Sequence, residues 1–186
     1  VDIYSKYLDE NNDKRWRIEH SQVVDPQDMP RYGKYNIIPS IQTTHATSDM
    51  DWADERLGDR IKYAYAYQEL LQQNGWLPNG SDFPIEHINP LYGFFSGVAR
   101  QHFNGEPKDG FQMENALTRE QALRAMTIWA AKSAFEENVK GSLEVGKFAD
   151  FVVLDFDLMN DSIKDIPHIK VQQTFVNGEK VYDVNE

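Results

Sequence analysis

The chain has no cysteine, and this absence excludes several kinds of site. Disulfides, thiolate metal ligands and a cysteine nucleophile are all ruled out, although the cellular compartment stays open. No apolar run approaches the roughly 18 residues that a membrane-spanning helix needs, and the first residues lack the pattern of a signal peptide. We therefore expect no membrane partner and take the cytoplasm as the expected location. Because the chain starts at Val1 and not at a methionine, we also expect the native N-terminus to be missing.

Basic residues are scarce in this sequence. There are 19 Lys and Arg residues against 30 Asp and Glu residues, which gives a net charge of -11. A phosphate backbone is repelled by most of such a surface, so we expect no nucleic-acid partner. Hydrophobic residues make up 40% and charged residues 26%, a mixture typical of a globular protein. A chain of 186 residues is long enough for one domain with a core, or for one domain with a small appendage.

Three short apolar segments in the first part of the chain predict strands. They cover residues 15–20, 35–42 and 76–82, and Pro39 weakens the second because proline cannot donate to a strand ladder. Between the last two, residues 48–75 place apolar side chains at helical spacing, and Gly75 provides a stop. Strand, helix and strand in this order predict βα units on a parallel sheet.

The pattern changes at about residues 110–118. Thr118 and Gln121 form a capping-box pair at the start of an apolar stripe, which predicts a helix within residues 117–135. Residues 151–154 then form an apolar run that we expect to be a buried strand. Two alternating runs flank Asn177-Gly178, the dipeptide most typical of a two-residue hairpin. We therefore divide the chain into an α/β part, residues 1–134, and a mostly β part, residues 135–186.

Each of the three predicted strands ends near a group that binds metals or moves protons. These groups are His20, His45 and Asp82, and the loops after parallel strands carry the functional groups of such folds. Any one of them alone is more often structural. Asp82, in a Gly-Ser-Asp turn before Pro84, also suits an aspartate that caps the next helix. Together, imidazole and carboxylate without thiolate favour a zinc, iron or manganese hydrolytic centre.

The remaining polar candidates have simpler interpretations. We expect His87, His102 and His168 to lie at the surface. An acidic cluster begins at Asp49 and continues through Asp51, Asp54 and Glu55. Carboxylates are stabilised at a helix N-terminus, so the cluster is interpreted as the start of a helix and not as a cation site.

Several sequence blocks occur in an order that resembles a known family. They include RWRIEHSQ (15–22), THATSDM (44–50), GSDFP (80–84) and GKFAD (146–150). The chain resembles the C-terminal half of a metal-dependent hydrolase of the amidohydrolase superfamily, specifically amidohydrolase family 3, and the resemblance covers essentially its whole length. The block at 146–150 is shared across the superfamily, whereas those at 44–50 and 80–84 are more particular to family 3.

This resemblance implies a (β/α)8 TIM-type barrel with a small β-sandwich. The chain would supply the last three βα units of the barrel and the C-terminal strands of the sandwich. His20 and Asp82 would be metal ligands, and Asp82 would also be the catalytic proton shuttle. Gln42 and His45 would face the substrate. One or two divalent ions, with zinc expected, would activate water to hydrolyse a C-N bond of an amide, an N-substituted formamide or a cyclic amide.

The chain departs from the family because the ligands expected on earlier barrel strands have no counterpart. A closed barrel of this kind also needs roughly 200 to 250 residues. We therefore expect a C-terminal fragment that is inactive alone. Its partners would be a small amide-type substrate and the missing N-terminal half, or another copy that pairs with an exposed strand edge. The alternative is a non-catalytic half-barrel module for association or regulation. Finding the missing ligand strands upstream of Val1 would favour the enzyme.

Overall fold

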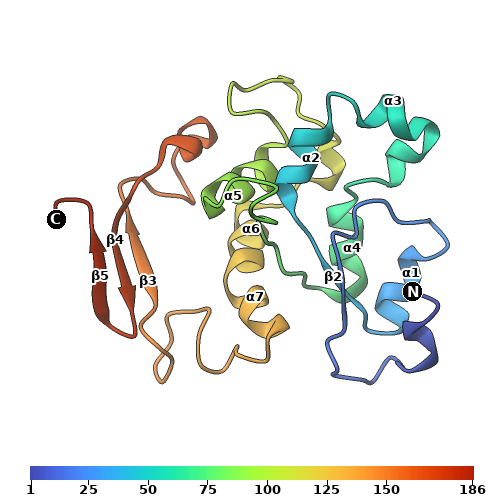
Figure 1. The fold of residues 1–186 in the computed structure, drawn as a ribbon, viewed down its shortest axis with the longest axis horizontal. Coiled ribbons are helices and arrows are strands. Elements are labelled where there is room, and N and C mark those ends of the chain that lie inside the picture. The colour runs from blue at the N-terminus through green and yellow to red at the C-terminus, as the bar shows by residue number, and fades with distance from the viewer.

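The computed structural model describes all 186 residues, and Figure 1 shows their arrangement. The helices and strands are β1 Arg17–Glu19, α1 Met29–Lys34, β2 Ile38–Ser40, α2 Thr43–Asp49, α3 Ala53–Leu57, α4 Tyr67–Asn74, α5 Pro90–Ala99, α6 Arg119–Met126, α7 Ile128–Ser133, β3 Phe151–Leu154, β4 Val171–Val176 and β5 Glu179–Asp183. Short 3-10 turns lie at Tyr4–Lys6, Gly58–Tyr63, Met113–Asn115 and Ile163–His168. None of the helices is long and apolar enough to span a membrane.

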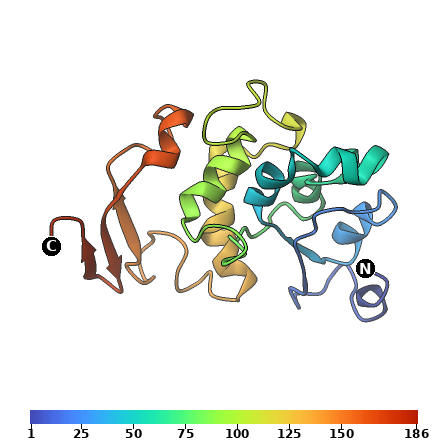
Figure 2. The same ribbon diagram turned by 45° about the horizontal axis from the view of Figure 1, so that its top comes forward.

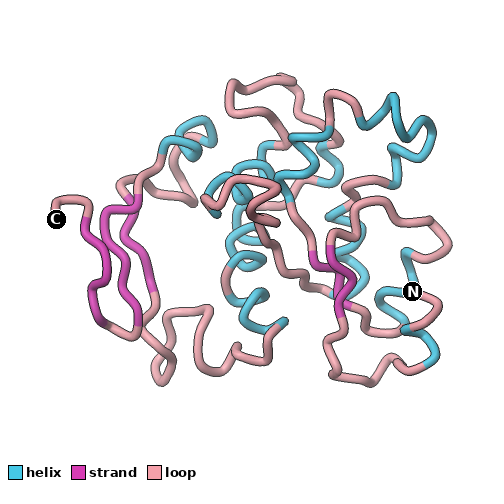
Figure 3. The backbone as a smooth tube through the Cα atoms, in the orientation of Figure 1, coloured by secondary structure: helices cyan, strands magenta, loops and turns pink.

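The first two predicted strands are confirmed as a parallel pair. Arg17 pairs with Ile38 and Glu19 with Ser40, so β1 and β2 end at the same edge of their sheet. The two short strands lie among the helices of the N-terminal part, well away from the other sheet (Figure 3). Ile37, Ile38 and Ile41 are fully buried, which anchors β2 in the core. Chain segments leaving β1 and β2 therefore emerge on one side of the molecule.

The third predicted strand is wrong as a regular strand. Residues 76–82 make only an isolated parallel bridge, between Asn79 and Ile41, the residue that follows β2. The Ile41 N-H donates to the Pro78 carbonyl at 2.9 Å, and the Gly80 N-H donates to the Ile41 carbonyl at 3.0 Å. The Asn79 N-H points away from β2 and donates to the carbonyl of Ala125 in α6 at 3.0 Å, while Pro78, which faces β2, has no N-H to donate. The ladder stops there, yet the segment still runs beside β2 in the parallel direction.

The helical pattern predicted over residues 48–75 is interrupted. The segment contains the last residues of α2, then the whole of α3, a 3-10 turn and α4, while residues 64–66 are not helical. Ala64 instead bridges Val23, and the Tyr65 N-H donates to the Gln22 carbonyl at 2.7 Å. The stop at Gly75 is confirmed, because this residue ends α4 in the left-handed conformation with φ 74°.

Helix α5 was not predicted from the sequence. Asn89 caps it by accepting a hydrogen bond from the Leu91 N-H, and Pro90 occupies its first turn. The helix packs closely on α2, where the Thr43 hydroxyl donates to the Gly93 carbonyl at 2.6 Å. A Cβ on Gly97 would lie 3.1 Å from Thr43 Cγ2, so a larger side chain would crowd this contact. In the sequence, Asn89-Pro90 is the signal that could have indicated the start of this helix.

The capping box at Thr118 and Gln121 is confirmed, with both reciprocal hydrogen bonds present. The predicted helix is nevertheless divided into α6 and α7 at Thr127, whose φ and ψ are -124° and -96°. Ala122 and Ala125 of α6 are buried in the main core. In the tilted view of Figure 2, α5, α6 and α7 lie between the N-terminal elements and the three-stranded sheet.

The C-terminal sheet has the order β3-β4-β5, and both pairs are antiparallel. The predicted hairpin is confirmed: Asn177 and Gly178 both have positive φ, 52° and 80°, as a type I′ turn requires. The prediction of a buried strand at 151–154 is wrong, since Val152 is 50% and Val153 is 41% exposed. A single three-stranded layer leaves side chains of both faces open unless a second layer covers them.

Candidate metal centre

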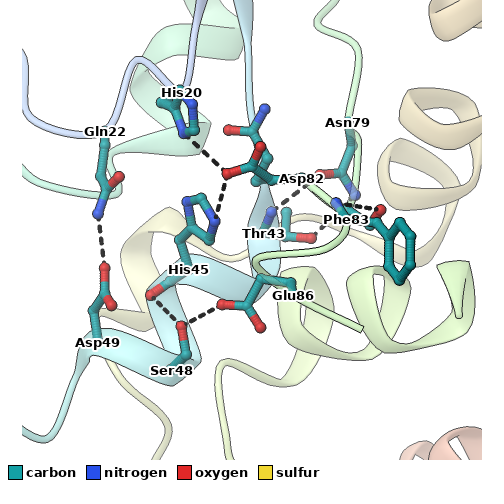
Figure 4. A network of polar contacts seen from close by, with 12 residues as sticks. His20, Gln22, Thr43, His45, Ser48, Asp49, Asn79, Asp82, Phe83 and Glu86 are labelled. Carbon is teal, nitrogen blue, oxygen red and sulfur yellow. Dashed lines mark hydrogen bonds and ion pairs between the residues drawn. The ribbon is translucent and has the colours of Figure 1, made fainter. Parts of the chain in front are cut away.

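His20, His45 and Asp82 converge although they belong to three separate segments (Figure 4). His20 follows β1, His45 lies in the first turns of α2, and Asp82 lies in the loop after the Ile41–Asn79 bridge. Asp82 Oδ2 is 3.9 Å from His20 Nδ1 and 3.5 Å from His45 Nε2. The two imidazole rings stack with centroids 5.4 Å apart. The structure therefore brings together the three residues that the sequence singled out.

Two of these residues have unusual backbone conformations. His20 has φ 68° and Asp82 has φ 57°, which is the left-handed region that residues other than glycine seldom adopt. Ser21 next to His20 is also left-handed, and its hydroxyl lies 3.0 Å from the Ile18 carbonyl and 3.1 Å from the Tyr32 hydroxyl. Such conformations persist where surrounding contacts hold them, and they are concentrated at functional sites.

The donor set fits a divalent metal ion. One nitrogen or oxygen from each of the three residues lies within 4.8 Å of the others. Two ligands bound to one tetrahedral zinc at about 2.1 Å would lie roughly 3.4 Å apart, close to the separations seen here. His45 Nε2 is buried and has no hydrogen-bond partner. A buried imidazole nitrogen that faces a carboxylate at 3.5 Å, too far for a hydrogen bond, is suited to share a cation with it.

The loop that carries Asp82 is tied to α2 at two places. Before Asp82, the side chain of Asn79 accepts from the Thr43 N-H and donates to the Thr43 hydroxyl, both at 3.0 Å. After Asp82, Glu86 Oε1 accepts a hydrogen bond from the Ser48 hydroxyl at 2.6 Å (Figure 4). These contacts hold the Asp82 loop against the helix that carries His45.

Gln42 is the residue immediately before α2 and is buried. Its carbonyl accepts a hydrogen bond from the Tyr67 hydroxyl at 3.0 Å, while its side-chain Oε1 has no partner in the protein. Burial raises the pKa of Tyr67, so this phenol stays protonated as a donor. The structure does not include Gln42 in the group of three donors, and its unpaired amide oxygen is free to bind another group.

Asp49 is a supporting residue that the sequence did not reveal. Asp49 is the last residue of α2. The prediction that it lies at the start of a helix is therefore wrong, whereas Asp54 and Glu55 do lie in the first turn of α3. Asp49 Oδ2 accepts hydrogen bonds from Gln22 Nε2 at 2.7 Å and from the Tyr65 hydroxyl at 2.8 Å. Burial, together with the hydrogen bond to Asp49, raises the pKa of Tyr65 to about 12.

A sequence model of the amidohydrolase family, its family 3 branch, matches residues 6–182. The chain therefore belongs to this family, and the resemblance inferred from the sequence blocks is confirmed. The α/β class predicted from the sequence is also confirmed by the arrangement of helices and parallel strands.

Several known proteins are similar to this chain. It is 35% identical over 188 residues to Protein LONG AFTER FAR-RED 3 of Arabidopsis thaliana, covering 98% of this chain and 31% of the relative. It is 31% identical over 103 residues to an N-substituted formamide deformylase of Arthrobacter pascens, covering 55% of this chain and 18% of the relative. A solved structure of an uncharacterized metal-dependent hydrolase from Pyrococcus horikoshii superposes with a TM-score of 0.68 at 27% identity, covering 79% of this chain and 30% of that one. The chain thus spans less than a third of the length of each.

Proposed function

We propose that this chain contributes a metal-binding half-site to an amidohydrolase that cleaves C-N bonds of small amide-type substrates. The observation that carries the proposal is the convergence of His20, His45 and Asp82, with the buried His45 Nε2 left unpaired. Membership of the amidohydrolase family supports the reaction class. The similarity to an N-substituted formamide deformylase supports formamides, simple amides or cyclic amides as the substrates to test first.

The residues of the site would divide the work as follows. His20 and Asp82 would hold a divalent metal, and zinc suits imidazole and carboxylate ligands without thiolate. When bound, such an ion supplies Lewis acidity and lowers the pKa of a coordinated water. Asp82 would accept the proton of the attacking water and return it to the leaving nitrogen. His45 and Gln42 would face the substrate, and His45 Nε2 also lies close enough to Asp82 to serve as a third donor.

The activity is proposed for a longer protein of which this chain is the C-terminal part. The relatives are more than three times as long as the matched segment, and β1 pairs with a neighbour only on the side of β2. In this proposal residues 1–134 are the last part of a (β/α)8 barrel and residues 135–186 are part of a β-sandwich. The rest of the enzyme would be the partner of the open edge of β1, and the chain alone would be inactive.

A non-catalytic association module is the second candidate. The observation that favours it is the open C-terminal sheet, on which the side chains of Val152, Val153 and Val181 are all more than two fifths exposed. Such a surface suits packing against another protein layer. A module of this kind would need neither a metal nor an unpaired His45 Nε2, so metal binding distinguishes the two candidates.

The test measures metal content and hydrolysis together. The purified longest gene product that contains this chain would be analysed for zinc, iron and manganese by elemental analysis. It would then be assayed with an N-substituted formamide, a cyclic amide and an ester of similar size. The proposal expects stoichiometric metal and release of amine from at least one amide, with both lost in the Asp82→Ala variant. A protein that holds no metal, and that associates in the same way with and without Asp82→Ala, would overturn the proposal in favour of the module.

A further inference from the structure

Arg100 is a buried arginine that the proposed chemistry does not use. It caps the C-terminal end of α5, and its exposed fraction is 0%. Its guanidinium donates from Nε to the Phe111 carbonyl at 2.8 Å, from Nη1 to the Tyr65 carbonyl at 3.3 Å and from Nη2 to Gln112 Oε1 at 3.1 Å. All of these acceptors are neutral oxygens. A buried cation is costly unless it is hydrogen-bonded, so these bonds fix Arg100 firmly to the segments around it.

Two tyrosines lie against this guanidinium. Besides the bond to the Tyr65 carbonyl, Arg100 Cζ lies 5.2 Å from the ring centroid of Tyr67, within the range of cation–π attraction. Tyr65 has φ 53°, a left-handed conformation that residues other than glycine keep only where surrounding contacts impose it. The contacts of Arg100 therefore hold the backbone of Tyr65 and the ring of Tyr67.

The hydroxyls of the same two tyrosines hold the two ends of α2. Tyr67 donates to the carbonyl of Gln42, the residue immediately before the helix, at 3.0 Å. Tyr65 donates to Oδ2 of Asp49, the last residue of the helix, at 2.8 Å. His45 lies between these two points, three residues after Gln42 and four before Asp49. We call the two tyrosines, together with the arginine behind them, the α2 clamp.

Helix α2 depends on such contacts because it is short. It has seven residues, and isolated helices of fewer than about 12 residues are marginal in water. Along one side, Thr43 and Thr47 bond it to α5. Arg100 caps that same helix α5, so it joins α5 to the segment that holds the ends of α2. The placement of His45 therefore depends on the ends of its helix as well as on the side that faces α5.

The α2 clamp also reaches the segment that carries His20. The Tyr65 N-H donates to the Gln22 carbonyl at 2.7 Å, and Gln22 lies two residues after His20. The side chain of Gln22 donates in turn to Asp49 Oδ2 at 2.7 Å (Figure 4). Tyr65 thus contacts both segments that carry a histidine of the candidate metal centre.

We propose that Arg100 is a positioning residue, which holds α2 and with it His45 in place through Tyr65 and Tyr67. The inference rests on the proposed function, since it concerns the geometry of the same donors. Arg100 bonds to none of the three donors itself, so it acts on the affinity for the ion and not on the reacting atoms. Lysine is a poor substitute, because a compact ammonium cannot reach acceptors spread around a planar guanidinium.

The first test measures zinc affinity against a competing chelator, in the longest gene product that contains this chain. Groups that touch metal ligands typically change affinity by about 10- to 100-fold, and we expect about 3- to 10-fold for Arg100→Lys and for Tyr65→Phe, which act at a greater distance. The double variant should stay within about twofold of Arg100→Lys, because both changes break the same connection. Multiplicative effects, or an unchanged zinc affinity in Arg100→Lys, would overturn the inference.

Arg119→Lys is the matched control. Arg119 also donates to two backbone carbonyls, those of Leu158 at 2.7 Å and Asp161 at 2.6 Å, but both lie in the C-terminal part of the chain. Because it is remote from the α2 clamp, this variant should keep the zinc affinity of the natural chain within about twofold, even where its stability falls. An equal loss of zinc affinity in the two arginine variants would reveal a general effect of instability and overturn the positioning role.

Hydrogen exchange in the metal-free protein separates this inference from the proposed function. The amides of α2 should exchange roughly threefold to tenfold faster in Arg100→Lys and in Tyr67→Phe, the effect of one lost hydrogen bond on local opening. They should be unchanged in Arg119→Lys. A protein that binds no zinc but shows this faster exchange would overturn the proposed function and support the α2 clamp. Unchanged exchange of α2 in Arg100→Lys would overturn the clamp, whatever the zinc affinity.

Discussion

Asp49 and Gln22 are joined by a 2.7 Å hydrogen bond across 27 residues of sequence. Gln22 follows His20 by two residues, and Asp49 ends the helix that carries His45. The same Asp49 oxygen accepts the Tyr65 hydroxyl at 2.8 Å. One carboxylate therefore connects the two segments that carry the histidines.

Replacing Asp49 with alanine should weaken metal binding without removing a donor. Supporting groups around metal ligands typically change affinity by about 10- to 100-fold, and we expect the lower end because Asp49 acts through the loop. Zinc titration with a competing chelator measures this change. Asp51→Ala is the matched control, because Asp51 lies two residues further on and contacts the partly exposed His102 instead, at 3.2 Å. Equal zinc affinities for the two variants would contradict a positioning role for Asp49.

Replacing Asp82 with asparagine tests the proposed role of its carboxylate, because asparagine has nearly the same size and shape but no charge. Asparagine tolerates the left-handed backbone at φ 57° that Asp82 adopts, so the loop should keep its conformation. The neutral side chain cannot accept the proton of water, so the rate of amide hydrolysis by the longest gene product that contains this chain should fall by about 10²- to 10⁴-fold. The thermal midpoint of the metal-free protein should stay unchanged, as measured by circular dichroism. Retention of activity would show that another residue carries the proton.

Metal addition should stabilise the folded chain, since the three donors are assembled only when the chain is folded. A ligand at about 100 times its dissociation constant stabilises the native state by roughly 2.7 kcal/mol. Differential scanning calorimetry with and without zinc checks this, and EDTA should reverse the shift. The shift should disappear in His20→Ala. In His45→Ala it should disappear if His45 is a third donor and persist if His45 only faces the substrate.

The ion pair between Arg15 and Glu137 should make the free energy of unfolding depend on pH. Its charged groups lie 2.8 Å apart and join the segment before β1 to the segment after α7. The hydrogen bond from Arg15 lowers the pKa of Glu137 below its ordinary value in the folded state. The stabilisation is therefore present above the unfolded pKa of about 4.3 and is lost as the pH falls through the lowered value.

Urea unfolding at pH 6 and at pH 3 measures this effect in Glu137→Gln. The variant should be less stable than the natural chain at pH 6, and the difference should be smaller at pH 3, because pH 3 lies below the pKa of Glu137 in the unfolded chain. Glu120→Gln serves as the control, because its partner Arg124 is half exposed on the surface of α6 and such pairs contribute about 1 kcal/mol or less. A difference that does not change with pH would argue against the Arg15 contact.

Gly33 should not tolerate even a methyl group. A Cβ at this position in α1 would lie 2.6 Å from the backbone carbonyl oxygen of Gln73 in α4. Alanine gains about 1 kcal/mol of helix propensity over glycine, but overpacking costs about 1 to 3 kcal/mol, and a backbone atom has little room to move. Gly33→Ala should therefore lower stability in urea unfolding. Gly80→Ala, where the new Cβ would meet nothing within 4 Å, should change it by less than about 0.5 kcal/mol.

Local patterns in the sequence were enough to predict several elements. The capping box at Thr118 depends on contacts within one turn, and the Asn177-Gly178 hairpin depends on two residues that accept positive φ. The convergence of His20, His45 and Asp82 followed from one rule, that parallel strands end at the same edge, together with the resemblance to a known family.

The sequence by itself determined the α/β class, the family and the three residues of the candidate centre. Only the tertiary structure decided where the patterns stop. The Asn79 N-H bonds to Ala125 and attaches the third segment to α6, while the Tyr65 N-H bonds to Gln22 and interrupts the helical pattern. It also decided that Asp49 supports the His20 loop. These outcomes depend on hydrogen bonds between residues that lie 27 to 46 positions apart in the chain, and no local spacing rule encodes which distant donor an acceptor will meet.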